Sequence, residues 1–372
     1  MEIPRRSFEG CIACISGIES EYSLSGCDQK RGKIMRYQRV ELHNHSTESD
    51  GEMTAAELMR WAEKEAYGVV ALTDHNTCSG HEKAEKTIQE EQLHIQLLKG
   101  IEVTTFYGHI LALGIEHMID FTNLDPRAPE KFLGKLRAAG AGAIGLAHPF
   151  CIGRPVTAGC RMDLEIHDWN QIDYIEVFNT SGGTEAMAGH IMGNRQALEF
   201  WEEKVLEGYH LAAVSGKDIH QKPQKFPVMI TYALLEDSGK GQNEGVEKAV
   251  LGAVMRQKTI VTKGPLLHAW AEKEDLWIEV DHSSEYENWN LKWAACHPVL
   301  RIRGKQIEKE LPLCFTKSTE KIKIAGVLKE EQEADSQKEH IVVLRMYEEN
   351  CQYENLLAAG ISVRWKSGGN EE

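Results

Sequence analysis

Histidine and carboxylate side chains recur at short spacings in the first 220 residues, in patterns that could hold metal ions. His43 and His45 form one His-x-His pair, and Asp218 and His220 form an Asp-x-His pair. Residues at positions i and i+2 of a strand point to the same face, so each pair could bind a single ion. Imidazole and carboxylate ligands without thiolate are typical of zinc, iron or manganese held for hydrolysis.

The other candidates are isolated residues, and their positions relative to the predicted strands make them informative together. A single histidine is common in protein cores and on surfaces, but this set repeatedly falls where an apolar run ends. Unpaired, such groups would be costly to bury. We therefore predict that nine ligands converge on one metal site: His43, His45, Asp50, His75, Glu102, His109, His148, Asp218 and His220.

The elements that must position these residues alternate between short apolar runs and helix-period segments from residue 40 to about 265, as in repeated βα units with a largely parallel sheet. Periodicity alone does not separate an open sheet from a closed barrel. The clearest helix begins at a capping box formed by Thr54 and Glu57. Further helices are predicted at 185–205 and 242–256. The predicted strands are 40–42, 69–72, 97–103, 110–113, 143–146, 172–178, 211–214 and 228–230.

The pattern changes after Pro265 to short alternating strands, which predicts an antiparallel sheet or sandwich. We predict three parts: an N-terminal segment, 1–37, whose strands could pair with the C-terminal region; a metallohydrolase domain, 38–265; and a β-rich accessory domain, 266–372. The charged tract 329–339 is interpreted as a solvated loop. The predicted C-terminal strands are 276–280, 291–293, 300–303, 321–324, 341–344 and 361–365.

Composition restricts the classes of partner and compartment. The chain has 372 residues, enough for two or more domains, and a net charge of −15, which disfavours duplex nucleic acid as a partner. Nine cysteines, an odd and scattered set, fit reduced thiols better than a disulfide framework. No segment is predicted to span a membrane or to act as a signal peptide, so we expect a cytoplasmic protein without a membrane partner.

With these motifs in view, the chain resembles the polymerase and histidinol phosphatase (PHP) family of metal-dependent phosphoesterases, over matching stretches from His43 to His220. The resemblance implies a distorted seven-stranded α/β barrel with two or three divalent ions at the strand ends. It also implies three ligand sets, with Glu102 bridging the first two. They are His43, His45, Glu102 and Asp218; Glu102, His109 and His148; and Asp50, His75 and His220.

Such a cluster would activate a shared water as hydroxide and neutralise an approaching phosphate. Arg154, six residues after His148, and Lys217, beside Asp218, are candidates for stabilising the leaving oxygen. At the position of Lys217 the family more usually has a small residue such as serine. Asp74 and Asn76 flank His75 and could fix its ring, because metal-bound imidazoles usually donate their second N–H to an acceptor.

The sequence leaves several alternatives open. The substrate could be a small phosphomonoester or a short phosphodiester. Residues 73–77 and the attached β-rich domain are also similar to the carbaryl-hydrolase branch of the superfamily, so the same metals could cleave a carboxyl or carbamate ester. A third reading is a non-catalytic, metal-stabilised binding module. The ligand set admits Zn, Fe or Mn, and the role of the C-terminal sheet and the oligomeric state are open.

Overall fold

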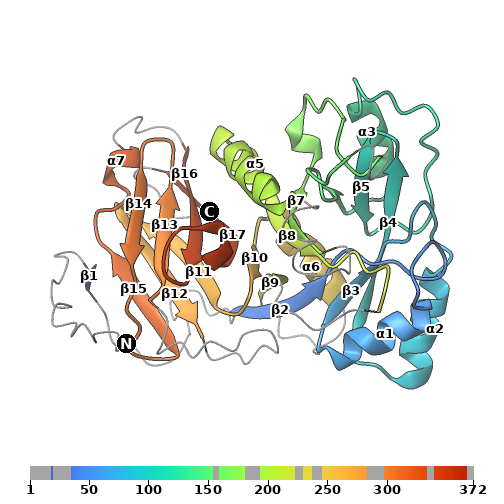
Figure 1. Ribbon diagram of the computed structural model, residues 1–372, viewed down its shortest axis with the longest axis horizontal. Helices are drawn as coiled ribbons and strands as arrows, with labels where there is room; N and C mark the ends of the chain where they lie inside the picture. Colours follow the sequence, from blue (N-terminus) through green and yellow to red (C-terminus); the bar gives the residue numbers. More distant parts are fainter. Residues whose placement is uncertain are drawn as a thin grey trace, which may run out of the picture.

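The computed structural model describes residues 18–19, 35–153, 159–180, 193–222, 229–236, 245–282, 297–332 and 339–366. In this part of the chain the strands form one sheet of thirteen strands and one of four. Figure 1 shows two lobes, one made of the blue to yellow elements with most of the helices, the other made of the orange and red strands. The division into domains at residues 37 and 265 stays a prediction.

The helix-rich lobe is built on a row of seven strands that follow one another in sequence order. Two triplets within it are parallel: β2, β3 and β4, and then β6, β7 and β8. The predicted α/β fold is therefore confirmed, with a large mixed sheet. The strands are β2 (Met35–Glu41), β3 (Val69–Leu72), β4 (Gln96–Thr105), β5 (Gly108–Leu113), β6 (Ala143–Leu146), β7 (Tyr174–Asn179) and β8 (Ala212–Gly216).

One strand departs from the predicted βα repeat. Strand β5 pairs antiparallel with both β4 and β6. Only Phe106 and Tyr107 separate β4 from β5, and two residues can close a hairpin but cannot make the crossover that parallel strands require. The hairpin places His109 opposite Thr104, two residues beyond Glu102 on the neighbouring strand.

The two ends of the row come close to each other. Strand β9 (Ile230–Glu236) pairs antiparallel with β2, and Thr231 Oγ1 in β9 accepts the backbone N–H of Ser215 in β8 at 2.6 Å. Beyond the strands, Asn44 and Ile219 form a parallel bridge. The segments that follow β2 and β8 therefore meet. No ladder joins β8 to β9 among the described strands, and the expected seven-stranded barrel is not confirmed in that form.

Helix α1 (Ala55–Lys64) begins at the predicted capping box, in which Thr54 Oγ1 accepts the N–H of Glu57 and the Glu57 carboxylate accepts the N–H of Thr54. The predicted helix at 185–205 is observed from Asn194, and 181–192 lie outside the described residues. No described helix is long and apolar enough to cross a membrane. The other main helices are α2 (His81–Glu91), α3 (Glu130–Ala138), α5 (Asn194–Glu207) and α6 (Val246–Met255).

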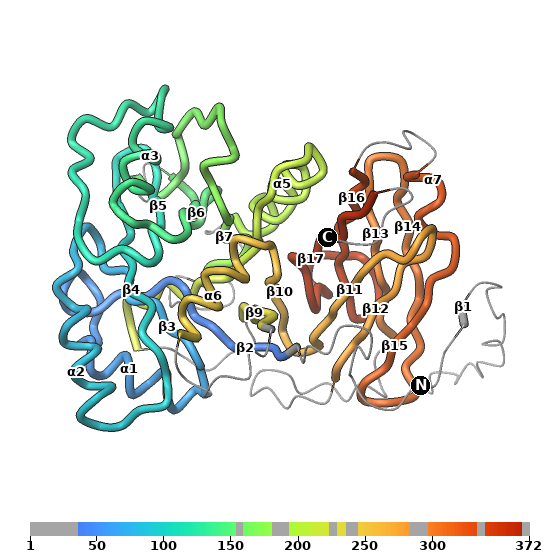
Figure 2. Tube along the Cα trace, turned by 180° about the vertical axis from the view of Figure 1, so that it is seen from behind, coloured from blue at the N-terminus to red at the C-terminus, as the bar shows by residue number. Residues whose placement is uncertain are grey.

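The second lobe stacks two antiparallel sheets, as the C-terminal pattern predicts. Its small sheet has the order β1-β15-β12-β11, and its other strands extend the large sheet from β10 in the order β17-β16-β13-β14. In Figures 1 and 2, β2, β9 and β10 lie between the lobes. The predicted strand 291–293 lies outside the described residues. The bounds are β1 (Ile18–Glu19), β10 (Thr259–Thr262), β11 (Leu266–Glu272), β12 (Asp275–Asp281), β13 (Val299–Arg303), β14 (Glu308–Pro312), β15 (Thr319–Ile324), β16 (Glu339–Tyr347) and β17 (Leu356–Lys366).

The interpretation of 329–339 as a solvated loop is wrong at its start. Residues Lys329–Gln332 form a short helix, α7, and Glu331 within it is buried. The Glu331 carboxylate accepts the backbone N–H groups of Lys305 and Gln306 at 3.0 and 2.8 Å. A buried acid is retained here because it satisfies two backbone donors of the neighbouring hairpin.

A buried ion cluster joins the lobes. Glu202 on α5 is 1% exposed, and its carboxylate pairs with Arg345 on β16 and, at 3.1 Å, with Arg303 on β13. Arg364 on β17 donates to the backbone carbonyls of Gly208 and Tyr209, just beyond the C-terminus of α5. These contacts hold α5 against the β-rich lobe.

Candidate metal centre

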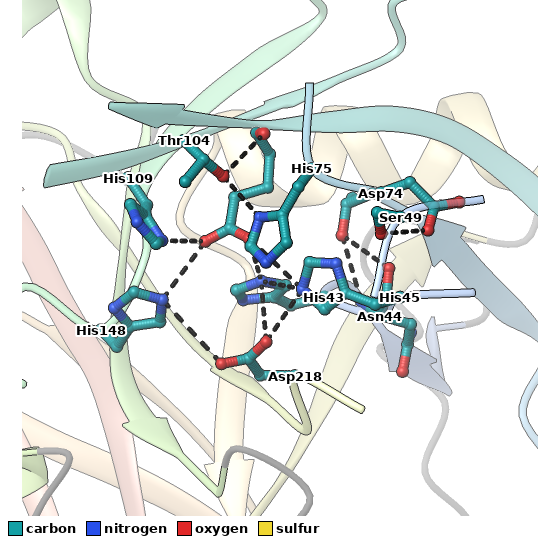
Figure 3. Close-up of polar contacts among 12 residues, drawn as sticks. His43, Asn44, His45, Ser49, Asp74, His75, Thr104, His109, His148 and Asp218 are labelled. Atoms are coloured by element: carbon teal, nitrogen blue, oxygen red, sulfur yellow. Dashed lines mark hydrogen bonds and ion pairs between the residues drawn. The ribbon is translucent and has the colours of Figure 1, made fainter. Parts of the chain in front are cut away.

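All nine predicted ligands lie in the described part of the chain, and their side chains converge at one end of the strand row. Figure 3 shows His109 and His148 on one side of the cluster, His43 and Asp218 at its centre and His75 close by. They come from segments up to 177 residues apart, which the meeting of the β2 and β8 ends makes neighbours. Potential ligand atoms of eight of the nine form three overlapping groups, and His148 Nε2 lies 3.2 Å from Glu102 Oε1, beside these groups.

The innermost group contains His43, His45, Glu102 and Asp218, all buried. His45 Nε2 lies 2.9 Å from Asp218 Oδ1 and 3.3 Å from Glu102 Oε2. His43 Nε2 lies 3.3 Å from the same Glu102 oxygen and 3.2 Å from His45 Nε2. Two ring nitrogens and two carboxylate oxygens thus point into one small volume, as the resemblance implied.

The second group shares Glu102 with the first. His109 Nδ1 lies 2.8 Å and His148 Nε2 3.2 Å from Glu102 Oε1, the oxygen that faces away from His43. His75 also approaches Glu102, with Nδ1 at 2.8 Å from Oε2. Glu102 therefore has one oxygen in each of two groups, which is the geometry of a bridging carboxylate.

The third group lies nearer the surface. His75 Nε2 and His220 Nε2 are 3.5 and 3.4 Å from Asp50 Oδ2, and 3.4 Å from each other. The side chains are 21%, 27% and 54% exposed for His75, His220 and Asp50, whereas that of Glu102 is fully buried. The cluster is therefore open to solvent on the Asp50 side.

Three of the seven non-glycine residues with positive φ in the described part of the chain lie at this site. His148, Asp218 and Asn76 have φ angles of 27°, 52° and 52°, in the left-handed region that non-glycine residues seldom occupy. Two of these three are candidate ligands. Strain of this kind persists where surrounding contacts fix the backbone, and it is common at functional sites.

Glu176 is a member of the site that the sequence reasoning missed. Its Oε1 accepts a hydrogen bond from His43 Nδ1 at 2.8 Å, while its Oε2 accepts from the His148 backbone N–H at 2.9 Å and from Asn179 Nδ2 at 3.0 Å. The first bond leaves the lone pair of His43 on Nε2, which faces the cluster. The available signal was an acid inside the apolar run 172–178, because a buried charge requires partners.

The roles expected for Asp74 and Asn76 differ from those observed. The Asp74 carboxylate accepts from the backbone N–H and hydroxyl of Ser46, at 2.7 and 2.8 Å, and so fixes the turn after His45. Asn76 hydrogen-bonds the backbone of Thr104 in both directions. His75 Nδ1 instead contacts Thr104 Oγ1. The ring of His75 is held from β4, opposite its own loop.

Arg154 and Lys217 are the two residues predicted to stabilise the leaving oxygen. Arg154 lies outside the described residues. The backbone N–H of Lys217 donates to Glu41 Oε1 at 2.9 Å, and burial, opposed by the charge of Glu41, lowers the pKa of its ammonium group. These contacts place Lys217 beside the buried Glu41, at the C-terminal end of β2. The role of Lys217 towards the leaving oxygen stays a prediction.

The electrostatic field of the cluster favours cations. Burial opposes a charged imidazole, but the carboxylates of Glu176, Asp218 and Glu102 outweigh it and raise the pKa of His43 well above its usual value. The same balance raises the pKa of His45 to about 9. In the other direction, the histidines overcome the effect of burial and hold the pKa values of Glu102 and Asp218 well below their usual range.

The residues present fit a set of divalent ions. Within the described residues, two buried carboxylate oxygens of the innermost group, Glu102 Oε2 and Asp218 Oδ1, accept no hydrogen bond and face histidine ring nitrogens at 2.8–3.4 Å. Buried polar atoms are normally satisfied, and a bound cation would satisfy these oxygens. Imidazole nitrogens and carboxylate oxygens suit Zn, Fe or Mn, and three groups could hold up to three ions.

Comparison with known proteins finds matches to part of this chain. Residues 41–198 match the sequence profile of the PHP domain. The 5'-3' exoribonuclease of Haemophilus influenzae is 35% identical over 82 residues, 21% of this chain and 29% of that protein. The 3',5'-nucleoside bisphosphate phosphatase of Chromobacterium violaceum is 37% identical over 81 residues, 21% and 28% of the two chains. The chain thus matches less than a third of the length of these curated relatives.

Among solved structures, the chain is similar to a two-domain protein from Bacteroides vulgatus that contains a predicted PHP-like metal-dependent phosphoesterase. The TM-score is 0.49 at 15% sequence identity, and the superposition covers 88% of this chain and 95% of that one.

Proposed function

We propose that the protein is a metal-dependent hydrolase of phosphoester bonds, acting on a small phosphorylated substrate, and that residues 41–198, which match the PHP domain profile, carry this activity. The observation that carries the proposal is the convergence of eight imidazole and carboxylate side chains into three overlapping groups, with His148 beside them at 3.2 Å from Glu102. As part of the same proposal, strands β2 to β8 serve as the distorted barrel that presents these groups.

Different residues of the chain position different parts of the centre. Glu102 spans the first two groups with its two oxygens, so it fixes their separation. Glu176 orients His43, and Asp74 fixes the turn that presents His45 and leads to Asp50. When bound, divalent ions would supply an activated water and a positive field for the phosphate oxygens. The partly exposed Asp50, His75 and His220 leave the phosphate a way in.

A substrate panel tests the proposal directly. The purified chain is treated with a chelator, reloaded with Zn, Mn or Fe, and assayed with nitrophenyl phosphate, bis-nitrophenyl phosphate and nitrophenyl acetate. We expect phosphoester hydrolysis that is lost on chelation and restored by metal. His43→Ala should remove turnover with little change in the unfolding midpoint of the chelated protein.

The other two readings of the sequence are distinct outcomes of this panel. Metal-dependent cleavage of the acetate alone would assign a carboxyl- or carbamate-ester hydrolase. Metal binding without turnover of any ester would identify the protein as a non-catalytic, metal-stabilised binding module. The cytoplasmic location and the exclusion of duplex nucleic acid and membranes as partners stay predictions.

A further inference from the structure

We propose that Glu41 is a positioning residue of the metal centre: its buried side chain joins β2 to the end of β8, where no ladder connects the two in the described part of the chain, and so sets how His43 and Asp218 face each other. This inference rests on the proposed function, which supplies the ions that these ligands hold. It adds a residue outside the candidate ligand set, and it explains how the two ends of the strand row are joined.

Strand β8 has an edge that no described strand pairs with. It is the last strand of the large sheet, and β7 is its neighbour there. All five residues of β8 are buried, so the backbone N–H and C=O groups along its other edge need partners. Strands β2, β9 and β10 already have a neighbour on each side, in the order β17-β10-β9-β2-β3. Side chains of these strands must therefore satisfy the edge of β8.

Three buried side chains do this, one from each of the three strands. They bond to alternate residues of β8 and its continuation, 213, 215 and 217, whose backbone groups face the same edge of a strand. We call these three bonds the β8 seam. They are Thr259 Oγ1 of β10 to the Ala213 carbonyl at 2.9 Å, the Ser215 N–H to Thr231 Oγ1 of β9 at 2.6 Å, and the Lys217 N–H to Glu41 Oε1 of β2 at 2.9 Å.

Glu41 is the member of the β8 seam that lies beside the ligands. Its Oε1 also accepts the backbone N–H of His43 at 3.4 Å, so one oxygen contacts a ligand's own peptide and the residue directly before Asp218. Past this point the main chains bond to each other. The N–H of Asp218 donates to the His43 carbonyl at 2.8 Å, and the N–H of His45 donates to the Ile219 carbonyl at 3.3 Å. Glu41 is therefore the last side-chain link before the two ligand-bearing segments join.

The innermost ligand group depends on this link. Asp218 Oδ1 lies 3.4 Å from His43 Nε2, and Asp218 has a φ of 52°, which a non-glycine residue keeps only where its surroundings fix the backbone. The peptide between Lys217 and Asp218 is held on both sides. Its N–H bonds to His43, and its carbonyl accepts the Thr180 hydroxyl at 2.8 Å. Glu41 holds the preceding N–H, so loss of its oxygen should let Asp218 turn away from His43.

The position requires an acceptor oxygen, and a negative charge is not needed for the two bonds. Both bonds are with backbone N–H groups, which the oxygen of an amide can also accept. Glu41→Gln keeps this oxygen at the same reach from the backbone. Glu41→Met keeps a side chain of similar length but leaves two buried N–H groups without an acceptor. Comparison of the two variants therefore separates positioning from packing.

Competition with a chromophoric chelator measures the affinity of the full chain for Zn and Mn. Glu41→Met should weaken binding about tenfold or more, as for other residues that hold metal ligands in place, and Glu41→Gln should bind as the wild type does. Thr259→Val, the matched control, removes the seam bond farthest from the ligands, so it should lower the urea midpoint and leave metal affinity unchanged. Wild-type affinity in Glu41→Met, or an equal loss in Glu41→Gln or Thr259→Val, would overturn the inference.

Hydrogen exchange of the chelated full chain tests the same contact without metal or substrate. In peptides that span residues 215–220, the amides of Lys217 and Asp218 should be protected in the wild type and in Glu41→Gln, and Glu41→Met should lose this protection. Rapid exchange of the two amides in the folded wild type would overturn the inference, even if Glu41→Met does not fold. A wild type that shows the protection but cleaves no phosphoester would refute the proposed function alone.

Discussion

Replacement of Glu176 by glutamine tests how far the centre depends on a carboxylate outside the candidate ligand set. Both Glu176 oxygens are engaged, Oε1 with His43 Nδ1 at 2.8 Å and Oε2 with the N–H of His148 and the amide of Asn179. An amide keeps only one acceptor. If its NH₂ group faces His43, the ring proton must move to Nε2, the atom that points at Glu102 and Asp218, where it blocks a metal.

The expected cost is about 10- to 100-fold in metal affinity, the usual effect of losing the partner of a metal-binding imidazole. That corresponds to about 1.4–2.8 kcal/mol of binding free energy. Competition with a chromophoric chelator measures it for Zn and Mn.

The matched control for this change is Glu202→Gln, which neutralises an equally buried acid at the lobe interface and should leave metal affinity unchanged. A Glu176→Gln variant that binds metal as tightly as wild type would refute the assignment of Glu176 as the residue that orients His43.

Three further predictions rest on other contacts, one of them at the metal centre. Glu202→Ala leaves buried Arg345 without its partner and should lower the free energy of unfolding by about 3–5 kcal/mol in urea titrations, without changing metal content after refolding. Gly216→Ala places a Cβ 2.0 Å from the Glu176 carboxylate, so elemental analysis should show loss of metal, and retention of metal would exclude this steric link. Burial, together with two nearby lysines, lowers the pKa of His268 to about 4. The unfolded chain therefore takes up the proton first, and the free energy of unfolding should fall as the pH drops from about 6.5 towards 4, a slope that His268→Gln should reduce.

The candidate ligands could be predicted from the sequence because residues that bind one ion often lie close together in the chain or at the end of an apolar run. His43 and His45 are spaced as in a strand and follow β2 directly, and Glu102 ends an apolar run, so a short window carries each signal. Glu176 leaves no such trace. Its partner His43 is 133 residues away, and the contact exists only because β7 and the end of β2 are brought together by the curl of the sheet.

Strand direction was harder to predict than strand position. Most predicted runs are strands, but β5 reverses because a two-residue loop permits only a hairpin, which apolar periodicity does not report. The tract around Glu331 was misread for a related reason. The charge of the tract predicts that it is exposed to solvent. Only the tertiary fold supplies the two backbone N–H groups that make burial of Glu331 favourable.

The metal content of the purified chain tests the central claim most directly. After reloading with Zn or Mn and removal of free ions, elemental analysis should find two or more ions per wild-type chain. Glu102→Gln should lose most of them, because that carboxylate contributes to two of the three groups. A wild-type chain that holds no ion under these conditions, or a Glu102→Gln variant that keeps the full complement, would contradict the account.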